Sequence, residues 1–176
     1  MTVHTIRIGI LTVSDRCFRG EYQDVGGPVT RRLVLEQLDG ATVEQEAIVP
    51  DERDMIAAML SAWADEAGLD LVLTTGGTGF APRDVTPEAT RDVIDREAPG
   101  LAEAMRAASL QITPHAMLSR AVAGIRGTTL IVNLPGSPKA VRENLETILP
   151  ALPHAVELIQ DRKGANRHHD APSRGM

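Results

Sequence analysis

The chain has 176 residues, a net charge of −6 and a composition that is 43% hydrophobic, 24% charged and 2% aromatic. This acidic balance disfavours nucleic acid or an anionic membrane as partner, and the single cysteine, Cys17, excludes an intrachain disulfide framework and a cysteine-based zinc cluster. Since no apolar run is long enough to span a membrane, we expect one cytoplasmic domain, residues 1–161, and a disordered polar tail, residues 162–176.

The first half of the chain alternates strand and helix patterns. Residues 5–13 predict a buried strand, residues 28–40 an amphipathic helix, and residues 42–49 an alternating strand near a sheet edge. A second amphipathic helix follows and ends near Gly68, and residues 69–74 form a short apolar strand. Repeated strand–helix–strand units predict an α/β fold with a parallel sheet.

Small polar residues follow the first two predicted strands, at the edge where open α/β sheets place their ligands. Ser14 and Asp15 follow the first strand, and their position alone does not separate a loop cap from a ligand contact. Asp51 follows the second strand, where the position favours a helix N-cap. A carboxylate at that edge could instead hold a divalent ion beside a phosphate.

The most distinctive stretch is residues 71–87, LVLTTGGTGFAPRDVTP, which predicts a buried strand, a glycine loop and a helix that Thr86 caps. The loop comprises Gly76, Gly77, Thr78 and Gly79. Glycine permits positive φ and close approach of a ligand, and successive N–H groups can bind an anion. The stretch lacks both the Walker lysine and the dinucleotide-fold glycine spacing. It predicts a phosphate site, and the alternative is a tight turn in which Asp84 is a solvated loop residue.

In the second half of the chain, some segments have clear secondary-structure patterns and others do not. The expected elements are helices over residues 88–96, 101–110, 138–149 and 150–160, and a strand over residues 128–134. Residues 117–127 fit no single pattern, and residues 109–114 are expected to be irregular. A second strand-to-helix junction spans residues 135–139, with Gly136 at the turn and Ser137 as a fitting N-cap.

Residues 74–89, TTGGTGFAPRDVTPEA, resemble the signature of the molybdopterin adenylyltransferases, which include bacterial Mog-type enzymes and the G domains of plant and animal molybdenum-cofactor proteins. Four further segments are similar: LTVSDR at 11–16, VPDE at 49–52, MLSR at 117–120 and NLPGSP at 133–138. The resemblance runs from about residue 5 to residue 160. It implies the three-layer α/β sandwich of the molybdenum-cofactor biosynthesis domain, with a mostly parallel sheet, in a homotrimer.

The resemblance also implies an activity, the transfer of AMP from Mg-ATP to the terminal phosphate of molybdopterin with release of pyrophosphate. It implies that Asp51 and Asp84 are the essential carboxylates, which we expect to hold Mg²⁺. The implied substrate-binding residues are Ser14, Asp15, Gly76, Gly77, Thr78, Gly79, Ser109, Ser119, Gly136 and Ser137. The intact run at residues 83–87 favours the adenylating branch, and a separate protein is expected to insert molybdate.

Three other functions compete with this one. The chain could bind or carry molybdopterin without adenylating it, or it could be a nucleotide pyrophosphatase like the competence-damage-type proteins. It could also be a trimeric scaffold whose carboxylates only cap helices.

Overall fold

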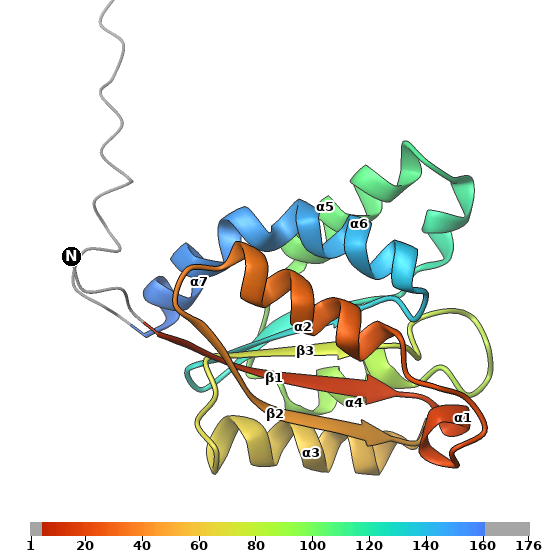
Figure 1. Ribbon diagram of the computed structural model, residues 1–176, viewed down its shortest axis with the longest axis horizontal. Coiled ribbons are helices and arrows are strands. Elements are labelled where there is room, and N and C mark those ends of the chain that lie inside the picture. Colours follow the sequence, from red (N-terminus) through yellow and green to blue (C-terminus); the bar gives the residue numbers. More distant parts are fainter. Residues whose placement is uncertain (1–4, 161–176) are drawn as a thin grey trace, which may run out of the picture.

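The computed structural model describes residues 5–160, in which a six-stranded sheet lies between two layers of helices (Figure 1). The elements in chain order are β1 (Ile6–Val13), α1 (Asp15–Phe18), α2 (Gly26–Gln37), β2 (Ala41–Val49), α3 (Arg53–Asp65), β3 (Leu71–Thr75), α4 (Thr86–Val93), β4 (Arg96–Glu97), α5 (Pro99–Leu110), the 3-10 helix η1 (Pro114–Leu118), β5 (Ala123–Arg126), β6 (Thr129–Leu134), α6 (Pro138–Ile148), the 3-10 helix η2 (Leu149–Ala151) and α7 (Leu152–Ile159). The predicted tail, residues 162–176, lies outside the described residues, and the predicted domain boundary stays a prediction.

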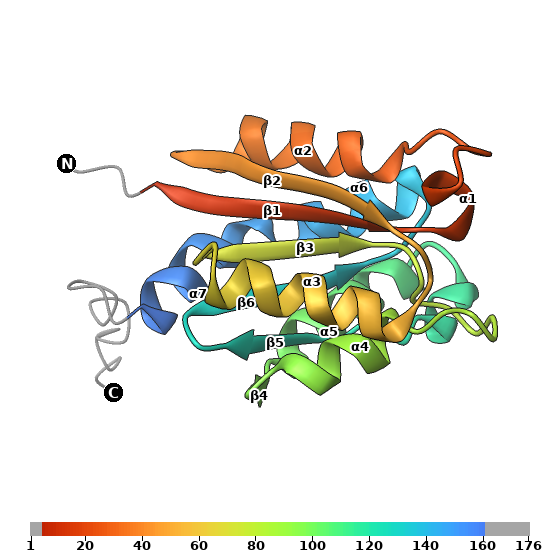
Figure 2. The ribbon, with the colours of Figure 1, turned by 90° about the horizontal axis from the view of Figure 1, so that it is seen from below.

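The sheet has the strand order β2-β1-β3-β6-β5-β4. Strands β2, β1, β3 and β6 are parallel, whereas β5 is antiparallel to β6 and β4 is antiparallel to β5. Figure 2 shows β5 running against its neighbours, and shows the carboxyl ends of the parallel strands at one edge of the molecule. The mostly parallel sheet and the edge position of β2 are thus confirmed, and the antiparallel end is an addition to the prediction.

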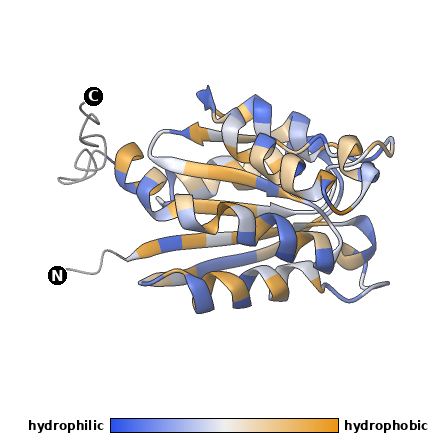
Figure 3. Ribbon diagram, turned by 90° about the horizontal axis from the view of Figure 1, so that it is seen from above, coloured by the Kyte–Doolittle hydropathy of each residue, from blue (hydrophilic) through white to orange (hydrophobic). Residues whose placement is uncertain are grey.

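The helices cover the sheet on both faces and enclose two hydrophobic cores. Helices α2, α5, α6 and α7 lie on one face, and α3 and α4 lie on the other (Figure 1). Because successive side chains of a strand point to opposite faces, Ile8 and Ile10 of β1 join the first core, while Leu11 and Val13 join the second. Figure 3 shows apolar residues along the strands and mixed hydropathy along the helices, as a doubly covered sheet requires.

The helix caps predicted at Asp51 and Thr86 are wrong, because the side chains of both residues form hydrogen bonds with other parts of the fold. Helix α3 begins at Arg53 with Glu52 as N-cap, since the Asp51 carboxylate accepts a hydrogen bond from the backbone of Asp15 instead. Helix α4 includes Thr86, whose hydroxyl donates to the carbonyl oxygen of Gly76 at 2.9 Å.

Ser14 and Ser137 both cap helices, which is one of the two interpretations that their positions allowed. Ser14 Oγ accepts a hydrogen bond from the backbone N–H of Cys17 at the start of α1, and Ser137 Oγ accepts one from Ala140 at the start of α6, each at 3.2 Å. Ser109 lies inside α5, within the helix predicted over residues 101–110 and not in the irregular segment that was expected from residue 109. The segment between β1 and α2 contains the one-turn helix α1.

The beginning and the end of the described chain meet at Asp70, just before β3. The backbone N–H of Arg7 donates to Asp70 Oδ2 at 2.8 Å, and the side chain of Gln160 donates to Asp70 Oδ1. Both contacts lie at the amino end of the parallel strands. None of the helices within residues 5–160 has the length and apolarity that a membrane span needs.

Candidate functional site

The glycine loop follows β3 and begins with two positions, 76 and 77, that only glycine can occupy. Gly76 has φ +102° and Gly77 has φ +65°, both in the region that side chains other than glycine rarely adopt. A Cβ at Gly76 would lie 2.3 Å from the carbonyl oxygen of Val13. A Cβ at Gly77 would lie 2.3 Å from Thr86 Oγ1 and 3.2 Å from Asp51 Oδ1. The backbone of Gly76 and Gly77 therefore packs directly against the end of β1, the start of α4 and the carboxylate of Asp51.

The loop contains backbone donors that have no acceptor among the described residues. The first glycine is held in place, because its N–H donates to the carbonyl oxygen of Leu134 and its own carbonyl accepts from Thr86. In contrast, the N–H groups of Gly77, Thr78 and Gly79 have no acceptor among residues 5–160. Since an unpaired N–H away from solvent is costly, an anionic oxygen is a fitting partner for such a run of donors.

Asp51 and Asp84 share one cleft and are arranged alike. Asp51 Oδ2 accepts from the N–H of Asp15 at 2.8 Å, and Asp84 Oδ2 accepts from the N–H of Ala81 at 3.0 Å. The second oxygen of each carboxylate has no hydrogen-bond donor within the described range 5–160. Burial raises the pKa of Asp51, and the charges of Asp15 and Asp84 raise that pKa further. The cleft therefore holds two mutually repelling carboxylates, each with an oxygen free to bind a cation.

Asp15 does not line the cleft, but it forms hydrogen bonds with Asp51 and with Arg83. Its carboxylate accepts from Arg83 Nε at 2.6 Å and from a second Arg83 nitrogen at 3.0 Å, and Arg83 also pairs with Glu52 at 2.7 Å. The bond from Arg83 lowers the pKa of Asp15, and its partners raise the pKa of Arg83. In addition, the N–H of Asp51 donates to Asp15 Oδ1 at 3.1 Å. Asp15 thus links the segment after the glycine loop to Asp51.

The cleft has a volume of about 450 Å³ and lies at the carboxyl ends of β1, β3 and β6. Of the predicted site residues, those on its wall are Ser14, Asp51, Gly76, Gly77, Asp84, Gly136 and Ser137. Asp15, Thr78 and Gly79 support the wall without lining it. Gly136 packs against the glycine loop, because a Cβ there would lie 3.4 Å from the Cα of Gly76.

Ser109 and Ser119 lie elsewhere, in a second cavity of about 210 Å³. This cavity is also lined by Arg106 and Asn144, and the side-chain amide of Asn144 donates to Ser109 Oγ at 3.2 Å. Pro135 and Ala140 line the second cavity, while residues 136–138 between them line the cleft. The β6–α6 junction therefore separates two neighbouring spaces, and the structure does not bring all predicted residues into one.

Residues between β1 and α2 contribute a wall of the cleft that was not predicted from the sequence. Arg16 and Tyr22 line the cleft, with the Arg16 guanidinium 4.6 Å from the centre of the Tyr22 ring. Asp24 also lines it, but its carboxylate accepts from Thr12 Oγ1 at 2.8 Å and from the N–H of Gly27 at 3.0 Å. Beyond the LTVSDR segment at residues 11–16, no residue pattern between β1 and α2 indicated a site.

A buried amide network lies beneath the glycine loop. Asn133 of β6 is fully buried, and its side-chain nitrogen donates to Thr74 Oγ1 at 3.1 Å and to Thr90 Oγ1 at 2.9 Å. Its side-chain oxygen accepts from the N–H of Val122 at 3.2 Å. Because buried polar groups are costly unless paired, this network fixes β3, β6 and α4 relative to one another. It thereby fixes the two strands and the helix that carry the site.

These features define an α/β protein with a polar cleft, lined by a glycine loop and two carboxylates, at the carboxyl ends of its parallel strands. Residues 9–154 match the family described as "Probable molybdopterin binding domain". That match covers most of the chain, and the chain therefore belongs to this family of molybdenum-cofactor biosynthesis proteins. The predicted resemblance is confirmed at this level.

Individual relatives agree with the family. The chain is 48% identical over 157 residues to the molybdopterin adenylyltransferase of Helicobacter pylori strain J99, covering 89% of both chains. It is 49% identical over 159 residues to the molybdenum cofactor synthesis protein cinnamon of Drosophila melanogaster, covering 90% of this chain but only 26% of that protein. The crystal structure of the molybdopterin biosynthesis enzyme MoaB from Thermus thermophilus is 56% identical, with a TM-score of 0.85, covering 90% of this chain and 98% of that one.

Proposed function

We propose that the protein adenylates the terminal phosphate of molybdopterin with Mg-ATP and releases pyrophosphate. Relatives that carry the name molybdopterin adenylyltransferase, such as the Helicobacter protein, match along almost their whole length. The observation that carries the proposal is the pair formed by Asp51 and Asp84, each with one oxygen fixed by a backbone N–H and one oxygen free, beside three unpaired loop N–H groups.

The donors in the cleft fit Mg²⁺. This ion prefers oxygen ligands, and it is usually bound through one or two carboxylates together with substrate phosphates. Asp51 and Asp84 supply two such carboxylates, and the residues that the structure describes contain no group of three or more potential metal ligands that would form a closed protein site. A cation between the two acids would also offset the repulsion that raises the pKa of Asp51. Bound there, Mg²⁺ would neutralise charge on the triphosphate as pyrophosphate departs.

The chain itself contributes orientation and charge placement. The N–H groups of Gly77, Thr78 and Gly79, which have no acceptor among residues 5–160, would bind phosphate oxygens, beginning at Gly77 on the cleft wall. The attacking oxygen, on the terminal phosphate of molybdopterin, is already ionised at neutral pH, so no strong general base is needed. The main task is to hold two anionic phosphates in line, and a fixed loop between two fixed carboxylates suits that task.

The direct test combines purified protein, molybdopterin and Mg-ATP, and measures pyrophosphate and adenylated molybdopterin in parallel. Adenylation requires the two products in equal amounts and no pyrophosphate when the pterin is omitted. Phosphate or pyrophosphate released without pterin would instead indicate a nucleotide pyrophosphatase. Neither product nor pterin binding would indicate a scaffold.

A second candidate function is molybdopterin binding without adenylation. It is favoured by the high similarity to the Thermus MoaB, which is named only as a molybdopterin biosynthesis enzyme. In that case, the protein would bind the pterin with the same affinity in the presence and absence of Mg-ATP, and no pyrophosphate would form. The run at residues 83–87 supports the adenylating alternative, because Arg83 is part of the network that holds Asp51.

Further assignments accompany the proposed function. We expect a homotrimer in the cytoplasm, whose product passes to a separate molybdate-insertion protein. Sedimentation equilibrium would test the trimer independently of any activity.

A further inference from the structure

Arg120 contacts the glycine loop at several points from outside the cleft. Its backbone N–H donates to the carbonyl oxygen of Thr78 at 2.9 Å, and its Nε donates to the carbonyl oxygen of Gly79 at 2.7 Å. Its two terminal nitrogens donate to the carbonyl oxygen of Asp84 and to the carboxylate of Glu88. One side chain therefore connects both ends of the segment 79–84 to the start of α4.

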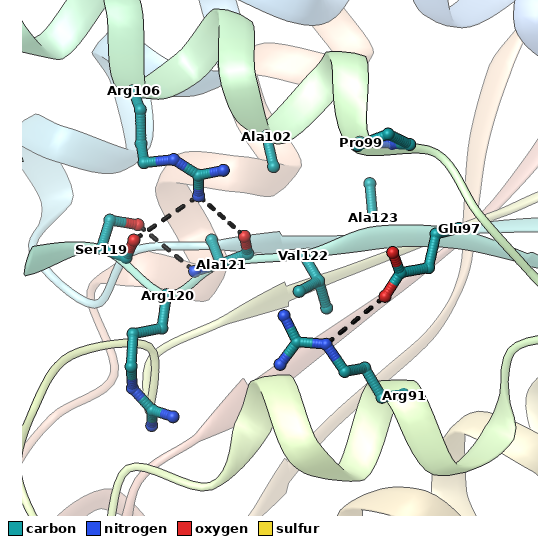
Figure 4. Close-up of a pocket in the computed structure, with 10 residues that line it drawn as sticks. All are labelled: Arg91, Glu97, Pro99, Ala102, Arg106, Ser119, Arg120, Ala121, Val122 and Ala123. Carbon is teal, nitrogen blue, oxygen red and sulfur yellow. Dashed lines mark hydrogen bonds and ion pairs between the residues drawn. The ribbon is translucent and has the colours of Figure 1, made fainter. Parts of the chain in front are cut away.

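The position of Arg120 separates it from the reacting groups. It does not line the cleft, and it lines a different cavity of about 360 Å³ beside α5. In Figure 4, Arg106 points to the backbone at Ser119 and Ala121, and Arg91 pairs with Glu97, whereas the Arg120 side chain extends away from both. The pairing with Glu88, where both side chains are 32% exposed, balances the charge of Arg120.

The loop needs such an external support. Three of its residues are glycines, which lose much conformational entropy when they are fixed. Thr86 fixes the beginning of the loop, through its bonds to the carbonyl oxygens of Gly76 and Gly77. Beyond that point, Arg120 supplies the bonds to Thr78, Gly79 and the Asp84 backbone. The planar guanidinium can hold several acceptors in fixed directions at once, which the single ammonium group of lysine cannot.

We propose that Arg120 is a positioning residue that fixes the backbone of residues 78–84 and thereby holds the Asp84 carboxylate in the cleft. The proposal rests on the proposed function, because it assigns these groups to the Mg-ATP complex. Arg120 acts through the backbone of the loop and does not touch the substrate.

The test uses Arg120→Lys, which keeps the charge and the pairing with Glu88, and Arg91→Lys as the control from the same cavity. Hydrogen–deuterium exchange of the amides of residues 76–84 and calorimetric binding of a non-hydrolysable Mg-ATP analogue are measured on each variant. We expect Arg120→Lys to speed loop exchange by about tenfold or more and to weaken analogue binding by a similar factor, while the melting temperature stays within a few degrees of wild type. Turnover should stay low even at saturating ATP, since the loop is misplaced in the bound state too.

Unchanged loop exchange and analogue affinity in Arg120→Lys would overturn the proposal, as would equal effects in Arg91→Lys. Arg120→Ala serves as a second variant and should exceed the lysine variant in both readouts; a smaller effect would also count against the proposal. If the wild-type protein forms no adenylated product, the proposed function fails. The exchange measurement still decides the role of Arg120 in that case.

Discussion

Asp15 and Asp51 each donate a backbone N–H to the carboxylate of the other, at 2.8 Å to Asp51 Oδ2 and at 3.1 Å to Asp15 Oδ1. This reciprocal pair joins the carboxyl ends of β1 and β2. Arg83 then clamps Asp15 with two hydrogen bonds, so the pair also fixes the segment that follows the glycine loop. The position of the Asp51 carboxylate consequently depends on Asp15 and Arg83, neither of which lines the cleft.

The first prediction concerns this clamp. Asp15→Ala and Arg83→Ala should each lower adenylation turnover by about 10- to 100-fold, since small displacements of catalytic groups have effects of that size. The double variant should be little worse than either single one, because both changes remove the same contact. Steady-state kinetics of the four proteins measures the coupling. Arg31→Ala, which breaks an exposed pair with Glu46, is the control and should change nothing. Fully additive losses would show that Arg83 acts independently of Asp15.

The second prediction concerns the two carboxylates in the cleft. Asp51→Asn and Asp84→Asn should each lower turnover by orders of magnitude, on the order of 10²–10⁴-fold, while the fold persists. The amide oxygen can still accept the backbone hydrogen bond, so the loss reports the missing charge. Circular dichroism and pyrophosphate release, measured on the same samples, check both parts. Near-normal turnover in either variant would contradict the metal role.

The third prediction concerns stability as a function of pH. The pKa of Asp51 is raised, mainly by burial, so the folded state binds this proton more tightly than the unfolded chain does. The ionised carboxylate therefore costs stability above the raised pKa, and the cost disappears as the pH falls below the ordinary value of 3.8. We expect Asp51→Asn to raise the melting temperature at neutral pH and to lose this advantage in acid. Thermal unfolding across this range measures it, and a variant less stable than wild type at neutral pH would argue against the burial cost.

The fourth prediction compares two glycines. Gly77→Ala should destabilise the protein by about 1–3 kcal/mol, because the residue has positive φ and its Cβ would collide with Thr86 Oγ1. Gly100→Ala, near the start of α5 with nothing within 4 Å of its Cβ, should be neutral or stabilising by up to about 1 kcal/mol. Urea denaturation gives both values. Equal effects at the two positions would mean that the loop tolerates a side chain.

The parts of the fold that the sequence predicts are those specified by local patterns. Each strand–helix–strand unit carries its own hydrophobic period and its own turn residues, so the parallel sheet and the strand before Gly76 could be identified. Strand β5 has only four residues and β4 only two, which is too short for a periodic signal. Strand β5 pairs with β6 and β4 pairs with β5, and no local pattern encodes either antiparallel contact.

In the site, too, features set by local sequence could be predicted and features set by long-range contacts could not. The glycine loop was recognised because glycine spacing is a local signal, whereas the hydrogen-bond partner of the Asp51 side chain was not. Its position favoured a helix cap, but the N–H that it accepts belongs to Asp15, 36 residues earlier. Arg120 is likewise separated by 36 residues from Asp84, whose carbonyl oxygen it contacts. Only the folded chain brings these partners together.

The meeting of Arg7 and Gln160 at Asp70 has a consequence for protein engineering. The start of β1 and the end of α7 lie at the edge of the sheet opposite the carboxyl ends of the parallel strands (Figure 2), so a tag or module joined directly to either element would begin on the side away from the cleft.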